Sequence, residues 1–182
     1  MNRRNFIVGL LGASGSAAFT SVWAQSPRPI LAEQIKIALQ QANQPMTKIE
    51  KLTLSDAEWK KRLSPAAYNV LRDEGTERAG TSPLNDEKRK GVFHCAGCDL
   101  PVYTSEMKFD SGTGWPSFFT TLPGAFETKT DRKLFMSRTE YHCARCGGHH
   151  GHVFDDGPAP TGQRWCNNGV ALRFVPGDGR AD

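Results

Sequence analysis

Helical spacing of apolar residues marks the start of the folded part of the chain, between residues 55 and 74. Ser55 is followed three residues later by Glu58, and this capping box favours a helix that begins directly after Ser55. Ser64 precedes Pro65, a residue typical of the first position of a helix, so a second helix is expected to begin there. The sequence therefore predicts two short helices at the start of the domain.

In the rest of the chain, the apolar and aromatic residues occur in short runs, such as residues 92–94, 134–136 and 170–175. Gly, Pro, Ser and Asp separate these runs, a texture typical of antiparallel strands joined by turns. A chain of 182 residues with ordinary apolar content is long enough for one core. We therefore expect a single, mainly β domain over residues 55–176, followed by a tail at 177–182.

The N-terminus has the pattern of an export signal. Arg3 and Arg4 precede an apolar run at residues 6–11, and mostly small side chains follow up to Ala24. Paired arginines before such a run are typical of the twin-arginine route of bacterial export. We predict a twin-arginine-type signal peptide at residues 1–24 and a periplasmic or otherwise exported protein. An uncleaved membrane anchor is the alternative.

Between the signal and the domain, residues 25–54 contain a Gln- and Ala-rich stretch flanked by prolines, which we interpret as a linker with helical tendency. The whole chain carries a formal charge of +4, and removal of residues 1–24 takes away two positive charges. The remaining charge is too weak and too interspersed to favour nucleic acid or an acidic membrane as a partner. We expect a monomer with no stable membrane insertion after cleavage.

Five cysteines divide into two C-x-x-C pairs and one isolated residue. The pairs are Cys95 with Cys98 and Cys143 with Cys146, while Cys166 stands alone downstream. Each pair places two thiolates on one tight turn, and two such turns together offer the tetrahedral sulfur ligands that zinc prefers. We therefore predict one structural zinc ion per chain. The alternative is two structural disulfides, although a two-residue spacer makes a strained and easily reduced bond.

Three histidines shortly after the second pair, His149, His150 and His152, leave open a mixed Cys/His metal site. Four thiolates already complete a closed site with no position for water, so the metal is assigned a structural role and the histidines are left outside it. A zinc hydrolase, with histidine ligands and an open coordination position, is the competing prediction.

The isolated cysteine has polar neighbours. If residues 164–168 are extended, Arg164, Cys166 and Asn168 point to the same face of the strand. A neighbouring guanidinium or hydrogen-bonding amide lowers the pKa of a thiol, so we expect the pKa of Cys166 to be low enough for a reactive thiolate. The alternative is a buried, inert cysteine.

Three separated blocks, at residues 111–118, 148–154 and 164–168, resemble the signature blocks of the MsrB family of methionine-R-sulfoxide reductases. They read SGTGWPSF, GHHGHVF and RWCNN. The sequence GTER at 75–78 and both C-x-x-C pairs follow the family's order, and the resemblance extends over about residues 55–175. It implies a mainly β, β-tent-like fold of two antiparallel sheets with short N-terminal helices, and a structural zinc opposite the active site.

The resemblance also implies reduction of the R epimer of methionine sulfoxide, free or in proteins. Cys166 matches the nucleophile, which attacks the sulfoxide sulfur and is left as a sulfenic acid. His152 and Asn168 match the polar groups near the sulfoxide oxygen, where a donor is needed because only a protonated or strongly hydrogen-bonded oxygen makes the sulfur electrophilic. Trp115 matches the ring against which the sulfoxide methyl group packs, which lets one epimer be selected.

Two further positions, His149 and Arg164, match residues that line and support the substrate pocket. The chain departs from the commoner family pattern at Thr113, where many relatives carry a second, resolving cysteine. The other four cysteines are assigned to zinc, so we expect a cycle with one redox cysteine. An external thiol, supplied by a thioredoxin-like protein, then reduces Cys166.

An exported zinc-ribbon-like binding module without catalysis is the competing function. Such a module has no need of His152, Asn168 and Trp115, and the export signal and weak charge oppose a nucleic-acid partner.

Overall fold

The computed structural model describes residues 49–131 and 138–177. The predicted signal peptide, almost all of the predicted linker, the apolar run at 134–136 and the tail beyond Gly177 lie outside these residues. Within the described part, no helix is both long and apolar enough to cross a membrane.

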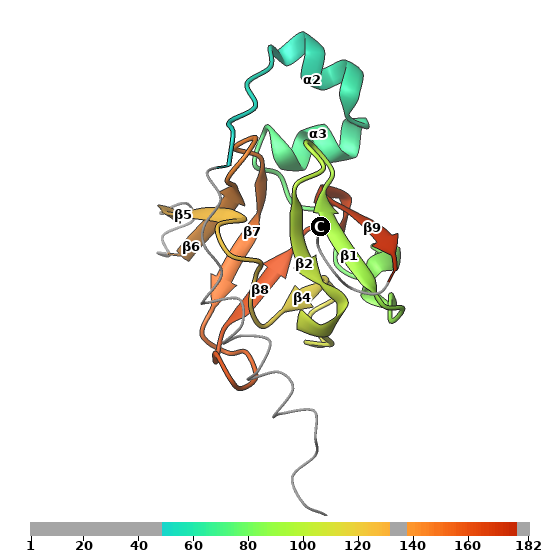
Figure 1. The fold of residues 1–182 in the computed structure, drawn as a ribbon, viewed down its shortest axis with the longest axis vertical. Coiled ribbons are helices and arrows are strands. Elements are labelled where there is room, and N and C mark those ends of the chain that lie inside the picture. Colours follow the sequence, from blue (N-terminus) through green and yellow to red (C-terminus); the bar gives the residue numbers. More distant parts are fainter. Residues whose placement is uncertain (1–48, 132–137, 178–182) are drawn as a thin grey trace, which may run out of the picture.

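Both predicted helices are present, and each begins where its cap was expected. Helix α2 (Asp56–Arg62) starts after Ser55, whose backbone N–H donates to the Glu58 carboxylate at 2.8 Å while its hydroxyl accepts the Glu58 N–H. Helix α3 (Pro65–Leu71) starts after Ser64, whose hydroxyl accepts a backbone N–H from the first turn at 3.2 Å. Figure 1 shows the two helices together at one end of the sheets. The capping predictions are therefore confirmed.

The strands form two antiparallel sheets (Figure 1). The first has the order β2-β1-β9, with β1 at Gly91–Cys95, β2 at Pro101–Thr104 and β9 at Leu172–Pro176. The second has the order β3-β4-β8-β7-β6-β5, with β3 at Lys108–Phe109, β4 at Ser117–Phe118, β5 at Phe126–Asp131, β6 at Arg138–Cys143, β7 at His149–Phe154 and β8 at Arg164–Asn167. Short 3-10 helices lie at Pro83–Asn85 (η1), Ser105–Met107 (η2) and Gly169–Ala171 (η4). The mainly β fold with two antiparallel sheets is therefore confirmed.

Aromatic side chains from both sheets meet in the core. The ring of Tyr103 in β2 stacks on that of Phe118 in β4, with centroids 3.8 Å apart. Phe93 in β1 contacts the same Phe118 ring edge-on at 5.1 Å. All three side chains are fully buried, so this cluster holds the three-stranded sheet against the six-stranded sheet.

Cys166 lies near the middle of the six-stranded sheet. In β8 it stands opposite Ser117 of β4 on one side and opposite His152 of β7 on the other. The predicted extended segment is correct up to Asn167, but the strand ends there and Asn168 leads into η4. The strand alternation predicted for Arg164, Cys166 and Asn168 therefore stops one residue before Asn168.

Candidate active site and metal site

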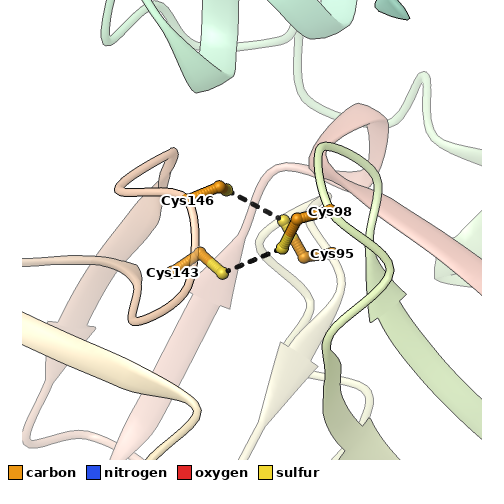
Figure 2. Close-up of side chains that lie close together, drawn as sticks. All are labelled: Cys95, Cys98, Cys143 and Cys146. Atoms are coloured by element: carbon orange, nitrogen blue, oxygen red, sulfur yellow. Dashed lines mark hydrogen bonds between the residues drawn. The ribbon is translucent and has the colours of Figure 1, made fainter. Parts of the chain in front are cut away.

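The four paired cysteines come together from two turns, one in each sheet (Figure 2). Cys95 and Cys98 belong to the turn after β1, while Cys143 and Cys146 belong to the turn between β6 and β7. In each turn the carbonyl of the first cysteine accepts a backbone N–H from four residues further on, at 2.9 Å and 2.8 Å. The site therefore joins the two sheets, as the long interval between the pairs requires.

The sulfur atoms have the spacing of a tetrahedral metal site. The Sγ atoms of Cys95 and Cys146 are 3.6 Å apart, those of Cys98 and Cys143 are 3.5 Å apart, and all four lie within 4.8 Å of one another. Thiolates bound to zinc at tetrahedral corners are about 3.8 Å apart, whereas a disulfide joins sulfurs at about 2 Å. All four thiols are buried and free, so the disulfide alternative is wrong and the group is placed to bind a metal ion.

The four clustered thiols can all be ionised only if a cation lies between them. A hydrogen bond with Cys143 lowers the pKa of Cys146 far below its usual range, whereas a hydrogen bond with Cys146 raises the pKa of Cys143 far above it. Four buried thiols at these distances cannot all be ionised without a compensating positive charge. A divalent ion that prefers sulfur, such as zinc, fits this donor set and would supply that charge.

The three histidines near this site are not members of the four-cysteine group. His150 is fully buried, and burial lowers its pKa to about 4. Its Nε2 lies 3.4 Å from the Sγ of Cys95, and its Nδ1 lies 3.2 Å from the Oδ1 of Asn167. Because Asn167 adjoins Cys166 in β8, His150 connects the metal site to the strand of the isolated thiol.

A pocket of about 130 Å³ opens beside Cys166. Its described lining residues are Thr76, Trp115, Arg138, Gly151, His152, Phe154, Cys166, Asn167 and Asn168. The three side chains expected near the nucleophile, those of Trp115, His152 and Asn168, are thus brought to one pocket with it. A larger hollow of about 560 Å³ between α3 and η4 contains neither this thiol nor a histidine among its described lining residues.

The environment of Cys166 differs from the expected one. Burial raises the pKa of its thiol above the ordinary value of 9.0, and the charge of Arg164 together with side-chain hydrogen bonds from Thr113 and Arg164 offsets only part of this effect. The prediction that polar neighbours make the net pKa low was therefore wrong, because desolvation of the thiolate outweighs them. At neutral pH the resting group is a thiol, so attack on a substrate requires a proton acceptor nearby.

His152 is the imidazole that lines the same pocket as Cys166. It stands opposite Cys166 in the β7–β8 ladder, and its Nε2 lies 3.0 Å from the Oδ2 of Asp131. Arg138 donates to the same carboxylate oxygen at 2.8 Å. Burial lowers the pKa of His152 below its ordinary value of 6.5, and the hydrogen bond that His152 donates to Asp131 acts in the opposite direction. The ring is therefore neutral at neutral pH, and with Nε2–H donating to Asp131 its Nδ1 is a proton acceptor.

His149 and Arg164 support the pocket from behind, and neither is among its lining residues. The Nδ1 of buried His149 lies 2.8 Å from the Glu140 carboxylate, and its ring contacts that of His152. Arg164 donates two hydrogen bonds to the Asp156 carboxylate, at 2.8 and 3.0 Å. His149 and Arg164, which were predicted to bind substrate, thus contact residues around the pocket and do not line the pocket in the described structure.

The backbone of Glu77 holds both Trp115 and Asn168. The carbonyl of Glu77 accepts the indole N–H of Trp115 at 3.1 Å, and its N–H donates to the Oδ1 of Asn168 at 2.9 Å. The amide nitrogen of Asn168 also donates to the carbonyl of His150 at 2.9 Å. Asn168 therefore has one amide hydrogen left for a substrate oxygen.

Several residues of the site were not identified from the sequence, namely the lining residues Thr76, Arg138, Gly151, Phe154 and Asn167, together with Asp131. Phe154 follows His152 by two positions in β7, so strand alternation could have placed both on one face. Asp131 and Arg138 reach His152 from β5 and β6, and nothing in their local sequence indicates that pairing.

Comparison with known proteins identifies the family. A family model described as the SelR domain matches residues 63–176, more than half of the chain. A peptide methionine sulfoxide reductase MsrB from Agrobacterium fabrum is 50% identical over 127 residues, which cover 69% of this chain and 94% of the relative. The MsrB of Pseudomonas putida is 51% identical over 135 residues, 74% of this chain and 99% of the relative.

A third relative, the MsrB of Methanosarcina barkeri, is 51% identical over 121 residues, which cover 66% of this chain and 85% of the relative. The matched region contains both C-x-x-C turns, the pocket and the isolated thiol. The chain therefore belongs to the MsrB family of peptide methionine sulfoxide reductases.

Proposed function

We propose that this protein reduces the R epimer of methionine sulfoxide with Cys166 as its nucleophile. The observation that carries the proposal is one pocket in which the thiol of Cys166 lies with the ring of Trp115 and the imidazole of His152. The family relationship supports the reaction class, an oxidoreductase acting on methionine-R-sulfoxide. It gives no support to a binding module without catalysis.

The proposed first step transfers an oxygen atom and two electrons. As Cys166 attacks the sulfoxide sulfur, its proton passes to His152, which then donates it to the sulfoxide oxygen. Attack forms a bond between the Sγ of Cys166 and the methionine sulfur. The bond between the methionine sulfur and its protonated oxygen then breaks as that oxygen passes to Sγ, and the sulfur–sulfur bond breaks with its electron pair returning to the methionine sulfur, which leaves Cys166 as a sulfenic acid. The methionine sulfur gains the two electrons that the cysteine sulfur loses.

Two aromatic rings supply the apolar part of the pocket. Trp115 and Phe154 line it together, and the Trp115 ring is fixed through its indole N–H. With the sulfoxide oxygen directed toward His152 and Asn168, the methyl group has to lie against an aromatic wall. Only one configuration at sulfur satisfies both contacts while it presents the sulfur to Cys166, so a single epimer is selected, and the family relationship identifies it as R.

An external thiol completes the proposed cycle. Thr113 occupies the place of a resolving cysteine, and the other four cysteines are grouped in the metal site. One thiol of a dithiol donor attacks the sulfenic acid, which forms a mixed disulfide with Cys166 and releases the oxygen as water. The second thiol of the donor then attacks the donor sulfur of that mixed disulfide, which frees the Cys166 thiol and leaves the donor as an internal disulfide. A thioredoxin-like protein is the donor that this chemistry favours.

The same proposal assigns one structural zinc ion to Cys95, Cys98, Cys143 and Cys146. When bound, the ion neutralises the thiolates and ties the β1–β2 turn to the β6–β7 turn. Four protein ligands leave no coordination position for a substrate, so the metal takes no part in the redox step.

The proposal also includes export of the enzyme from the cytoplasm. The paired arginines Arg3 and Arg4 and the apolar run after them support a twin-arginine signal at residues 1–24 and a periplasmic or otherwise exported enzyme. We further propose a monomer, with oxidised proteins or free methionine sulfoxide as its substrate.

The reaction is tested with the two sulfoxide epimers. The mature domain, incubated with each epimer and dithiothreitol, is expected to release methionine from the R epimer alone, because Trp115 and His152 fix the methyl group and the oxygen on opposite sides of the sulfur. Methionine is measured by chromatography. Equal turnover of both epimers would overturn the assigned pocket, and no turnover of either would overturn the proposed function.

The pH dependence of kcat/KM follows from the two shifted pKa values. The reactive state pairs the Cys166 thiol with a neutral His152 ring. Below the lowered pKa of His152, acid protonates the ring, which then no longer accepts the thiol proton. Above the raised pKa of Cys166, alkali removes the thiol proton that the sulfoxide oxygen needs. The pKa of His152 lies below its ordinary value of 6.5 and that of Cys166 lies above its ordinary value of 9.0, so kcat/KM is expected to be constant between pH 6.5 and 9.0. His152→Gln should remove the acid limb, and a midpoint inside the plateau would contradict the assigned pair.

A further inference from the structure

A chain of three hydroxyl groups lies beside Cys166. The Oγ of Ser117 lies 2.8 Å from the Oγ of Ser111, which lies 2.8 Å from the Oγ1 of Thr113. Ser117 is paired with Cys166 across β4 and β8, so the three hydroxyls lie beside the thiol, and the hydroxyl of Thr113 lowers the pKa of Cys166 as a hydrogen-bond donor. At the other end, the hydroxyl of Ser117 donates to the backbone carbonyl of Trp115 at 3.1 Å.

The loop that carries Thr113 is held on both sides. Before it, the N–H of Gly112 donates to the Asp110 carboxylate at 2.9 Å. After it, the carbonyl of Gly114 accepts the N–H of Gly80 at 2.7 Å. Both loop glycines have positive φ angles, a backbone conformation that other residues rarely adopt. The Thr113 hydroxyl is therefore placed before a substrate arrives.

The hydroxyl protons of this chain can point in two directions. With a neutral thiol, Cys166 donates to Thr113, and each hydroxyl donates to the next until Ser117 reaches the carbonyl of Trp115. With a thiolate, the order reverses, and Ser117 donates to Ser111, Ser111 to Thr113 and Thr113 to the sulfur. The carbonyl cannot take up a proton, so the chain reorients without carrying the proton away.

We propose that Thr113 is a catalytic residue, which donates a hydrogen bond to the sulfur of Cys166 as negative charge develops on it, and that Ser111 and Ser117 are positioning residues that aim this hydroxyl. The proposal rests on the proposed function of Cys166 as nucleophile. Where other members of the family carry a resolving thiol, this chain has a hydroxyl that serves the attack step.

Other groups also face the sulfur, and all of them remain when Thr113 is changed. Those with charge or a titratable proton are Arg164, Asp156, His152, Asp131, Arg138, Tyr103 and Tyr141. The phenols of Tyr103 and Tyr141 are fully buried and have raised pKa values, chiefly through burial, so they stay neutral over the working range. A change caused by removing one hydroxyl is therefore separable from their effects.

The test measures the ionisation of Cys166 without turnover. Holoprotein carrying Thr113→Val, which keeps the side-chain shape, is alkylated with iodoacetamide over a range of pH, and modification of Cys166 is followed by peptide mass spectrometry. A hydrogen bond to a charged group is strong enough that its loss should slow alkylation about tenfold at pH 8 and move the midpoint upward. Thr113→Ser should restore the wild-type profile, because it keeps the hydroxyl.

The matched control is Thr128→Val, on an exposed position of β5. It should leave the alkylation profile and kcat/KM unchanged, while Thr113→Val should lower kcat/KM about tenfold with normal zinc content. An unchanged alkylation profile in folded Thr113→Val overturns the proposal even if the protein reduces methionine sulfoxide. A shifted profile in a protein without reductase activity supports the hydroxyl contact and overturns the proposed function instead.

A second variant tests the geometry alone. Thr113→Cys should form a disulfide with Cys166 under mild oxidation, because the side chain at 113 already reaches the sulfur. The product is detected by intact mass and non-reducing peptide mapping. Failure of a folded variant to close this bond would show that the two side chains do not meet, which overturns the proposal.

Discussion

Replacement of Cys166 by serine is expected to lower kcat/KM for the R-sulfoxide by more than about 10³-fold, because a hydroxyl of ordinary pKa is a far weaker nucleophile than a thiolate. The side chains have nearly the same shape, and Cys166 is not one of the four clustered cysteines. Circular dichroism and zinc content should therefore match those of the wild type. Steady-state assay with dithiothreitol measures the loss.

Two other variants show whether the loss reflects chemistry at this thiol. Arg164→Ala removes a cation beside the sulfur but leaves the nucleophile, so it should retain measurable turnover. Cys166→Ala should be as inactive as Cys166→Ser. Turnover by Cys166→Ser within tenfold of the wild type would mean that another group attacks the sulfoxide.

Loss of the metal site is expected to unfold the domain. Structural zinc contributes about 10–16 kcal/mol of apparent binding free energy in small zinc domains. That figure is comparable to or larger than the net stability of about 5–15 kcal/mol of an ordinary folded domain. Cys98→Ser combined with Cys143→Ser removes one ligand from each sheet, so the β1–β2 and β6–β7 turns lose their common anchor.

The measurements are zinc content, thermal unfolding and activity of the double variant. We expect no bound zinc, loss of the cooperative unfolding transition and loss of activity in parallel with it. Cys166→Ser is the control, since it replaces a cysteine outside the metal site and should keep both zinc and the transition. A folded, metal-free and active double variant would contradict the structural role. Activity lost from a protein that stays folded would indicate catalytic zinc.

Features determined by neighbouring residues in the sequence were predictable. Ser55 with Glu58 and Ser64 with Pro65 set the helix starts through local hydrogen bonds, and each C-x-x-C pair closes its own turn. The chemistry of zinc predicted that the two turns meet, because four thiolates are needed to complete one site. The resemblance to the family supplied the meeting of distant blocks in one pocket.

Features determined by tertiary packing were not predictable in the same way. Whether Asp131 and Arg138 meet His152 depends on the register of β5, β6 and β7, which their own sequences do not fix. The direction of the pKa shift of Cys166 depends on burial, and the polar residues beside it in the sequence indicated the opposite. The hydroxyl chain through Ser111 and Ser117 likewise appears only once β4 pairs with β8.

A single-turnover experiment tests the central claim most directly. Reduced protein is mixed with one equivalent of the R-sulfoxide, without added reductant and with dimedone to trap sulfenic acid. We predict release of one methionine per chain and a single adduct on Cys166, identified by peptide mass spectrometry. Release of methionine with a disulfide between Cys166 and a metal-site cysteine, or with the adduct on another residue, would contradict the division of the cysteines into one nucleophile and four ligands.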